Sequence, residues 1–318
     1  MVTVALAYLL AAKPQVTAWV VGYNPKSIER FAERADQIDA VFMEAYGVTA
    51  DGLAFRRPDN ISPFKKAREI AKKHKVQFFA MISNYAAGEG EDGFDPKRMT
   101  KALETEESRR AFATGLLKIA KEDKADGVDL DLESLKADDR NRYSKFVILL
   151  GNMLHDSKMK LSVTVHAKET VEGNWDGVKA HDYKALGSVA DRFNVMTYDF
   201  SWSSGPEGPI APTAWVERVM KFASTQMPAS KLGMGIACYG YDWGTKPARS
   251  LSWNDLAVKP TKVDPESGEL VDGKMHFSGA GAFRAKYDLA SKLGLGSVAF
   301  WYCGSEDPGI WKFLPIRK

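Results

Sequence analysis

The stretch DGVDLDLE, residues 126–133, alternates acidic and aliphatic residues and decides the fold of the chain. Successive side chains of a β-strand point to opposite faces, so Asp129, Asp131 and Glu133 share one face and the aliphatic residues share the other. Because unpaired carboxylates are costly to bury, the acidic face must line a polar cavity. Neighbouring carboxylates also repel each other's charge, which raises the pKa of at least one and supplies a proton donor near neutral pH.

Two simpler interpretations of this stretch exist. An amphipathic strand with its acidic face in water would show the same alternation. A calcium-binding loop needs glycine at its sixth position and polar residues between its ligands. Counted from Asp129, the sixth position is Ser134, and leucines separate the acids. The pattern therefore favours a cavity-lining strand.

Length and composition predict one large domain. The chain has 318 residues, 45% of them hydrophobic, which is enough for a single core. With 44 Lys and Arg against 41 Asp and Glu, nothing suggests nucleic acid or an anionic membrane as partner, and no stretch is apolar enough to span a membrane. Two cysteines, Cys238 and Cys303, are too few for a disulfide framework, and we expect no bond between them. We expect a monomer.

The N-terminal segment allows two interpretations. Residues 1–12 are apolar and end in small residues, as in the hydrophobic part of a secretory signal, but they lack a positively charged leader. The alternative is an ordered strand or extension. We therefore expect a leader or extension at 1–15, one domain at 16–318, and a secreted or cell-envelope protein, with a cytoplasmic location left open.

Apolar strand-like runs alternate with helix-like segments along the whole sequence. The expected strands are 17–23, 38–46, 76–83, 126–133, 160–166, 192–200, 231–239 and 296–301, and the expected helices are 27–35, 63–74, 105–121, 138–158, 181–186, 212–226 and 282–293. Eight such units in about 300 residues predict a parallel (β/α)₈ TIM barrel. An open doubly wound sheet is the alternative, but no glycine-rich phosphate fingerprint follows an early strand. Prolines and glycines at 251–277 predict a short irregular insertion between strand 7 and helix 7, with a hairpin near 265–268.

Polar and aromatic residues gather at the carboxyl ends of the predicted strands, where barrel enzymes carry their chemistry. These residues are Tyr23, Tyr46, Asn84, Glu133, His166, Tyr198, Asp199, Tyr239, Tyr241 and Trp301. For Tyr23, Tyr46 and Tyr239, simple packing at the barrel rim is an equal alternative. His166 and His181 lack metal-ligand spacing, so we expect no metal.

The octapeptide resembles the D-G-x-D-x-D-x-E signature of the glycoside hydrolase family 18 chitinases and matches all five fixed positions. The segment MTYD at 196–199 is similar to that family's M-x-Y-D, and Trp301 stands where the family keeps a tryptophan beneath the sugar. Residues 180–187 and 304–308 resemble a narrower branch, the bacterial spore-germination and cell-envelope glycosidases. The resemblance covers residues 16–315.

The sequence departs from the family in three places. Leu132 replaces the usual Trp or Tyr before the catalytic glutamate, and the third strand ends in ISNY at 82–85 instead of S-x-G-G. The insertion that deepens the chitinase groove is reduced to residues 251–277. We therefore expect a shallower cleft, which puts long crystalline chitin in doubt as a substrate.

The resemblance implies a substrate-assisted retaining glycosidase whose nucleophile is the substrate's own acetamido oxygen. It implies that Glu133 is the acid and base, that Asp131 holds the acetamido N–H, that Asp129 shares a proton with Asp131, and that Tyr198 holds the acetamido carbonyl. The substrate would carry a 2-acetamido sugar, GlcNAc in chitin oligomers or peptidoglycan. Predicted substrate-binding residues are Trp301, Met196, Asp199, Tyr241, Tyr46, Tyr23 and Asn84. No metal or cofactor is required, and Asp126 at the strand entry is expected to be structural.

Two other functions compete with this one. A sugar-binding barrel without catalysis would typically have lost the acid, whereas Glu133 is present. A glycosidase with two enzyme carboxylates would need a second carboxylate on another strand, and Glu207 and Asp242 are poorly placed for that role.

Overall fold

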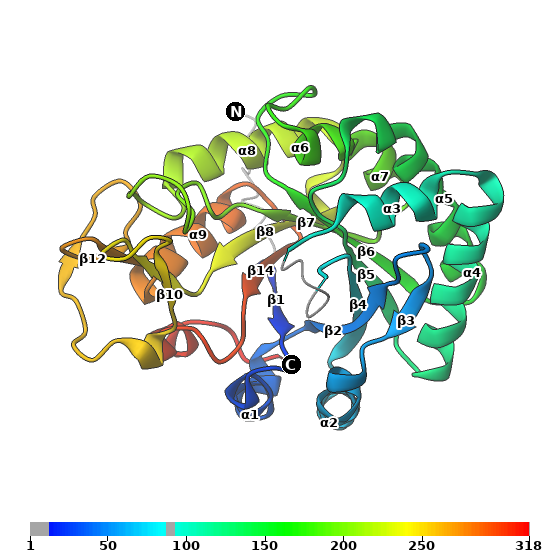
Figure 1. The fold of residues 1–318 in the computed structure, drawn as a ribbon. Helices are drawn as coiled ribbons and strands as arrows, with labels where there is room; N and C mark the ends of the chain where they lie inside the picture. The colour runs from blue at the N-terminus through cyan, green and yellow to red at the C-terminus, as the bar shows by residue number, and fades with distance from the viewer. Residues whose placement is uncertain (1–12, 87–92, 318) are drawn as a thin grey trace, which may run out of the picture.

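The computed structural model describes residues 13–86 and 93–317 and is a closed barrel of eight parallel strands surrounded by helices (Figure 1). The barrel strands are β1 Gln15–Val20, β2 Ala40–Val48, β4 Gln77–Ser83, β5 Gly127–Asp131, β6 Lys160–His166, β7 Arg192–Met196, β8 Leu232–Ala237 and β14 Ser297–Trp301. Pairing of β1 with both β14 and β2 closes the ring. The predicted (β/α)₈ barrel is confirmed. Residues 1–12 of the leader or extension predicted at 1–15 lie outside the described residues.

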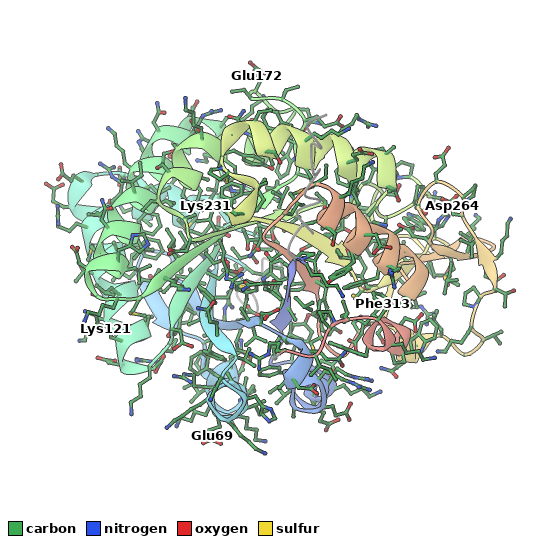
Figure 2. All side chains as sticks on the ribbon, turned by 180° about the vertical axis from the view of Figure 1, so that it is seen from behind. Glu69, Lys121, Glu172, Lys231, Asp264 and Phe313 are labelled. Carbon is green, nitrogen blue, oxygen red and sulfur yellow. The ribbon has the colours of Figure 1, made fainter. Side chains whose placement is uncertain are left out.

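Nine α-helices are described, and most of them cover the outer face of the barrel (Figure 1). They are α1 Pro25–Arg34, α2 Ile61–His74, α3 Pro96–Leu103, α4 Glu106–Glu122, α5 Arg140–Asp156, α6 Asp176–Ala180, α7 Tyr183–Val189, α8 Thr213–Gln226 and α9 Ala280–Lys292. Charged side chains of these helices and their loops, such as Glu69, Lys121 and Glu172, extend into solvent (Figure 2). No described helix is both long and apolar enough to cross a membrane.

Outside the insertion, one strand and two α-helices were not predicted from the sequence: β3, α3 and α6, the last lying just before the helix expected at 181–186. Strand β3, Ala54–Arg56, pairs antiparallel with the end of β2. Helix α3 begins at Pro96, where the side chain of Asp95 accepts a hydrogen bond from the Lys97 N–H. Proline at the first helical position after an aspartate cap is a helix-start signal. The run before it is rich in glycine and acidic residues, which are typical of a loop, so the sequence pattern did not favour a helix here.

The two faces of each barrel strand have different neighbours. Val128 and Leu130 of β5 are fully buried in the large core between strands and helices. The inward face of the barrel holds a smaller cluster formed by Trp19, Ala40, Phe42, Phe79, Met81 and Ala299. Both cysteines are buried and unbonded. The apolar side of the alternating sequence therefore holds the barrel to its helices and leaves the polar side for the interior.

The insertion between β8 and α9 forms a small antiparallel sheet beside the barrel mouth. Its strands are β9 Gly240–Asp242, β10 Arg249–Leu251, β11 Lys262–Val263, β12 Leu270–Asp272 and β13 Met275–Phe277. The hairpin predicted near 265–268 is present between β11 and β12, but the sheet begins earlier than expected, at Gly240. Buried Glu269 accepts the backbone N–H groups of Ile210 and Ala211 and so ties the sheet to the loop after β7.

Candidate active site

The acidic face of β5 points into the barrel, as the alternation predicts. Asp129 is fully buried, and its carboxylate accepts hydrogen bonds from Trp19 Nε1 at 3.4 Å and Thr164 Oγ1 at 3.2 Å. Asp131, one layer nearer the mouth, is 6% exposed, and its Oδ1 is buried without a hydrogen-bond partner. The deeper carboxylate is thus satisfied by the protein, whereas the upper one retains an open acceptor.

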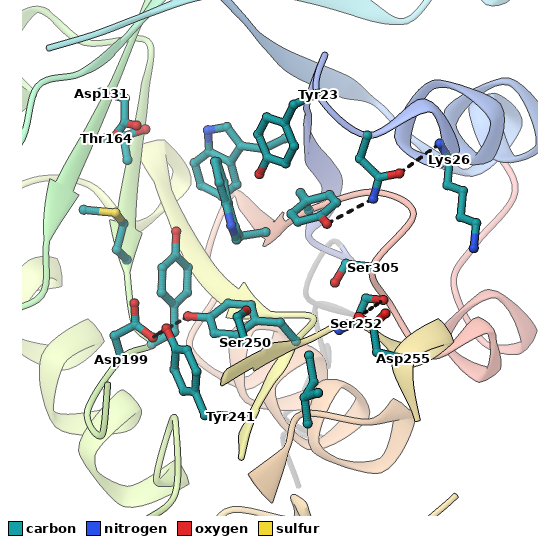
Figure 3. Close-up of a pocket in the computed structure, with 18 of the residues that line it drawn as sticks. Tyr23, Lys26, Asp131, Thr164, Asp199, Tyr241, Ser250, Ser252, Asp255 and Ser305 are labelled. Carbon is teal, nitrogen blue, oxygen red and sulfur yellow. Dashed lines mark hydrogen bonds between the residues drawn. The ribbon is translucent and has the colours of Figure 1, made fainter. Parts of the chain in front are cut away.

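A cavity of about 650 Å³ opens above these residues at the carboxyl ends of the strands (Figure 3). Most of the residues predicted for the site line it: Tyr23, Asp131, Glu133, Met196, Tyr198, Asp199, Tyr241 and Trp301. Trp301 at the end of β14 packs against Trp19 with ring centres 5.9 Å apart. An aromatic wall beside a row of carboxyl groups suits a ring with one apolar face and polar edges, such as a sugar.

Tyr46 does not line the cavity, contrary to the prediction. The register between β2 and β4 shifts between Glu44 and Tyr46, so β2 carries an extra residue at this point. Such a bulge reverses the alternation beyond it. Tyr46 is therefore turned to the outer layer, where it is fully buried and its hydroxyl donates to Asp123 at 2.9 Å.

Asn84 does not line the cavity either, but it supports a residue that does. Its Oδ1 accepts the backbone N–H of Glu133 at 2.9 Å, and its Nδ2 donates to the backbone carbonyl of Glu133, also at 2.9 Å. Asn84 is fully buried. Its predicted role as a substrate-binding residue is replaced by a positioning role, because both ends of its amide hold the backbone of Glu133.

The segment after β7 brings a further carboxylate to the cavity. Asp199 has a left-handed backbone with φ of 57°, and its Oδ1 accepts the hydroxyls of Tyr239 at 2.5 Å and Tyr241 at 3.1 Å. Tyr198 lines the same cavity. Tyr198, Asp199 and Tyr241, all expected at strand ends, therefore lie at the same cavity, and Tyr239 joins them.

Burial and mutual repulsion make the carboxyl groups of the site hold their protons. Burial raises the pKa of Glu133 to about 8, and the charge of Asp199 adds to the effect. Burial, followed by the charges of Glu133, Asp129 and Glu44, raises the pKa of Asp131. Burial also raises the pKa of Asp129 to about 6, although its hydrogen bonds oppose the rise. Near neutral pH, Glu133 is therefore an un-ionised acid.

Several residues of the site were missed from the sequence, among them Thr164 and Trp19, which bond to Asp129. His166 was expected at a strand end but was given no role in the site, and it lies beside Glu133. The stretch KLSVTVH at 160–166 carries a usable signal, because its polar residues alternate with aliphatic ones just as those of β5 do. The rest of the cavity lining is formed by Asn24, Lys26, Phe94, Ser250, Leu251, Ser252, Asn254, Asp255, Tyr302 and Ser305. Figure 3 labels Lys26, Ser250, Ser252, Asp255 and Ser305 among them. These come from loops and from the insertion, which no strand periodicity could place.

The arrangement supplies a neutral acid, an open carboxylate oxygen and an aromatic wall in one cavity. No group of three or more His, Cys, Asp or Glu residues in the described part of the chain could hold a metal ion. Acid–base chemistry on a neutral, ring-shaped substrate is what these side chains can perform. This combination defines a glycosidase-like site.

Comparison with known proteins identifies the class. The sequence profile of "Glycosyl hydrolases family 18" matches residues 16–306. The chain therefore belongs to glycosyl hydrolase family 18 and is a glycosidase.

Relatives include chitinases and enzymes of the bacterial spore cortex. The chain is 29% identical over 291 residues to the "Uncharacterized glycosylase YvbX" of Bacillus subtilis, covering 85% of this chain and 83% of that protein. It is 29% identical over 270 residues to the "Cortical fragment-lytic enzyme" of Bacillus cereus, covering 78% of this chain but only 62% of that enzyme. The crystal structure of a chitinase from Chromobacterium violaceum superposes with a TM-score of 0.84 at 26% identity and covers 94% and 97% of the two chains.

Proposed function

We propose that this glycosidase hydrolyses β-1,4 linkages next to a 2-acetamido sugar, GlcNAc in chitin oligomers or peptidoglycan, by a substrate-assisted retaining mechanism. The observation that carries the proposal is the buried, unpaired Oδ1 of Asp131 in the same cavity as the neutral acid Glu133. A buried acceptor without a partner is unfavourable until a donor arrives. The N–H of an acetamido group is such a donor.

In the first step, the proton of Glu133 passes to the glycosidic oxygen while the C–O bond breaks. The acetamido carbonyl oxygen attacks the anomeric carbon and forms an oxazolinium ion, so the enzyme needs no second carboxylate as nucleophile. Asp131 accepts the acetamido N–H and stabilises the positive charge that develops on the ring. Asp129 shares a proton with Asp131, and the two titrate as a pair.

In the second step, Glu133 takes a proton from water, and the oxygen of that water attacks the anomeric carbon from the face that the leaving group vacated. The bond between the anomeric carbon and the acetamido oxygen breaks, which opens the oxazolinium ion and restores the acetamido group. The configuration is retained and Glu133 is an acid again. Tyr198 is proposed to hold the acetamido carbonyl in its attacking position, and Trp301 to stack beneath the sugar. Met196, Asp199, Tyr23 and Tyr241 are proposed to bind the substrate around this centre, since all four line the cavity.

Peptidoglycan and chitin oligomers are both proposed as substrates. The names of the relatives favour this pair, because they include cortical fragment-lytic enzymes and chitinases. The insertion is short, and a shallow cleft suits short or accessible chains better than crystalline chitin. We further propose that the protein works outside the cytoplasm or at the cell envelope, where such polymers lie.

The proposal is tested with a fluorogenic GlcNAc oligomer and three proteins: the wild type, Glu133→Gln and Glu207→Gln. Glu207 is an exposed glutamate that does not line the cavity and serves as the matched control. We expect the rate to fall by about 10²–10⁴-fold for Glu133→Gln, the usual contribution of a general acid, and to be unchanged for Glu207→Gln. Equal rates for the wild type and Glu133→Gln would end the assignment.

Two product analyses separate the remaining alternatives. NMR of the first-formed sugar distinguishes retention from inversion at the anomeric carbon, and inversion would exclude the substrate-assisted route. Digestion of purified peptidoglycan and of chitin oligomers side by side, with product masses, identifies the sugar at the cleavage point. Binding of both polymers by the wild type without any product would favour a sugar-binding barrel instead.

A further inference from the structure

A histidine lies directly behind Glu133. His166 ends β6, and its Nε2 is 3.5 Å from Oε2 of Glu133. The two side chains are only 15% and 16% exposed. His166 is not among the residues that line the cavity, so any effect it has on a bound sugar must pass through Glu133.

The imidazole of His166 is held between two rings. Trp175 contacts it with ring centres 4.6 Å apart, and His181 stacks on it at 5.3 Å with an interplanar angle of 22°. His181 Nδ1 accepts the backbone N–H of His166 at 3.2 Å, and His181 Nε2 lies 3.1 Å from the carbonyl oxygen of Leu132. These contacts link the end of β6 to the end of β5 and fix the His166 ring beside Glu133.

The hydrogen bonds of His166 define which of its nitrogens carries the hydrogen. The backbone N–H of Ser134 points at His166 Nε2 at 3.4 Å, so Nε2 is the acceptor and the ring hydrogen is on Nδ1. Burial lowers the pKa of His166 to about 4, which leaves the ring neutral at physiological pH. Oε2 of Glu133 lies 3.5 Å from this unprotonated nitrogen, whose one lone pair is within reach of both Ser134 and Glu133. A lone pair repels a carboxylate oxygen, but it accepts a hydrogen bond from a carboxylic acid.

We propose that His166 is a positioning residue for Glu133: its unprotonated Nε2, whose one lone pair also receives the long Ser134 N–H contact, accepts the carboxyl hydrogen of Glu133 and keeps that side chain in its acid form and in place. The inference rests on the proposed function only in taking Glu133 as the acid. The 3.5 Å separation is long for a hydrogen bond, and contacts of catalytic groups commonly tighten when substrate binds.

The same contact assists both steps of the reaction. When Glu133 gives its proton to the leaving oxygen, its carboxylate is left beside the lone pair of His166, which makes it a stronger base. It then recovers a proton from the attacking water. His166 itself neither gains nor loses a proton, so the balance of the reaction is unchanged.

Other titratable groups lie near Glu133 and His166 and affect the protonation of these two side chains. On the cavity side, Asp131, Asp199 and Tyr198 lie within electrostatic reach of Glu133. The two aspartates also oppose its ionisation, but by charge alone. Behind His166 lie His181 and Lys168, and the ammonium of Lys168 is engaged by the carbonyls of Val171, Val178 and His181. His166 alone of these brings a neutral nitrogen acceptor to Glu133 Oε2.

Two substitutions separate an acceptor role from a packing role. His166→Phe keeps a flat ring between Trp175 and His181 but replaces the lone pair with a C–H edge, which is slightly positive. His166→Gln loses the ring but can place its side-chain oxygen where Nε2 was, facing the Ser134 N–H. Both variants keep the backbone hydrogen bonds of residue 166: its N–H donates to His181, and its carbonyl accepts the hydroxyl of Tyr183. The wild type and both variants are assayed for kcat and KM across pH with the fluorogenic GlcNAc oligomer.

We expect His166→Phe to lower kcat by about tenfold with little change in KM, and to move the alkaline limb of the pH profile to lower pH. We expect the kcat of His166→Gln to stay within a few-fold of the wild-type value, with the alkaline limb of its pH profile unmoved. The reverse order, with Phe active and Gln impaired, would show a packing role and overturn the proposal. Wild-type behaviour of His166→Phe in both kcat and pH profile would overturn it too.

A measurement on the wild-type protein keeps the proposal testable if a variant fails to fold. The chain has 5 histidines, so ¹⁵N NMR of histidine-labelled protein gives few signals, and His166→Gln assigns the one of interest. If that variant does not fold, Trp175→Phe assigns the signal by shifting it, since Trp175 contacts the His166 ring. We expect an unprotonated Nε2 and a protonated Nδ1 from pH 5 to pH 8. A hydrogen on Nε2 in this range would overturn the proposal. This readout needs no substrate, so it is independent of whether the proposed glycosidase mechanism is correct.

Discussion

Replacing Glu133 with glutamine is expected to stabilise the fold at alkaline pH while it removes activity. Burial raises the pKa of Glu133 from 4.5 to about 8, so the folded protein holds this proton more tightly than the unfolded chain does. The stabilisation from the bound proton is complete below about pH 4.5 and is lost as the pH rises through about 8. Above that pH the wild type carries an ionised and mostly buried glutamate, 16% exposed, whereas glutamine stays neutral.

The magnitude follows from the size of the shift. At about 1.4 kcal/mol per pH unit, a rise from 4.5 to about 8 corresponds to about 5 kcal/mol. Asp131 lies next to Glu133 and titrates with it, so part of this energy belongs to the pair. We therefore expect the free energy of unfolding of Glu133→Gln, relative to that of the wild type, to rise by roughly 2 kcal/mol between pH 5 and pH 9.

The assay is urea unfolding at pH 5, 7 and 9, followed by the fluorescence of the 8 tryptophans. Glu207→Gln is the control, and its free energy of unfolding is expected to differ from that of the wild type by the same amount at each pH. A stability difference for Glu133→Gln that does not change between pH 5 and pH 9 would show that Glu133 is not a buried acid with a raised pKa. The electrostatic reasoning about the site would then be wrong.

Three further predictions follow from the same contacts. The rate of hydrolysis is expected to be highest between about pH 6 and about pH 8. In this range Glu133 is protonated while the Asp129–Asp131 pair keeps a negative charge. A rate that still rises at pH 9 would contradict this expectation. Trp301→Ala is expected to raise KM for a chitin oligomer by about tenfold, equivalent to about 1.4 kcal/mol. The control is Trp202→Ala, which is expected to leave KM unchanged, because Trp202 is exposed and does not line the cavity. Asn84→Ala is expected to cost about 2–3 kcal/mol in urea unfolding, since it leaves the backbone N–H and C=O of Glu133 without their partners. A cost below about 0.5 kcal/mol would mean that Asn84 does not hold that backbone.

The sequence alone determined the barrel and the row of acids inside it. Alternation along a strand is a local property, so DGVDLDLE fixes which side chains share a face without knowledge of any other segment. The same reasoning located Tyr198 and Trp301 at the barrel mouth, because carboxyl ends of parallel strands meet at one end. The antiparallel insertion was foreseen as irregular chain with one hairpin, since prolines and glycines mark turns but not pairing partners.

Only the tertiary structure decided which residues from distant segments touch the acids. One extra residue in β2 turns Tyr46 outward, and a bulge leaves no periodic trace in so short a strand. Asn84 holds the Glu133 backbone across 49 positions, and Trp19 reaches Asp129 across 110. His166 meets Glu133 because β5 and β6 pair in one particular register. Register between strands is set by packing of the whole barrel, and for that reason the supporting residues of the site could not be assigned from the sequence.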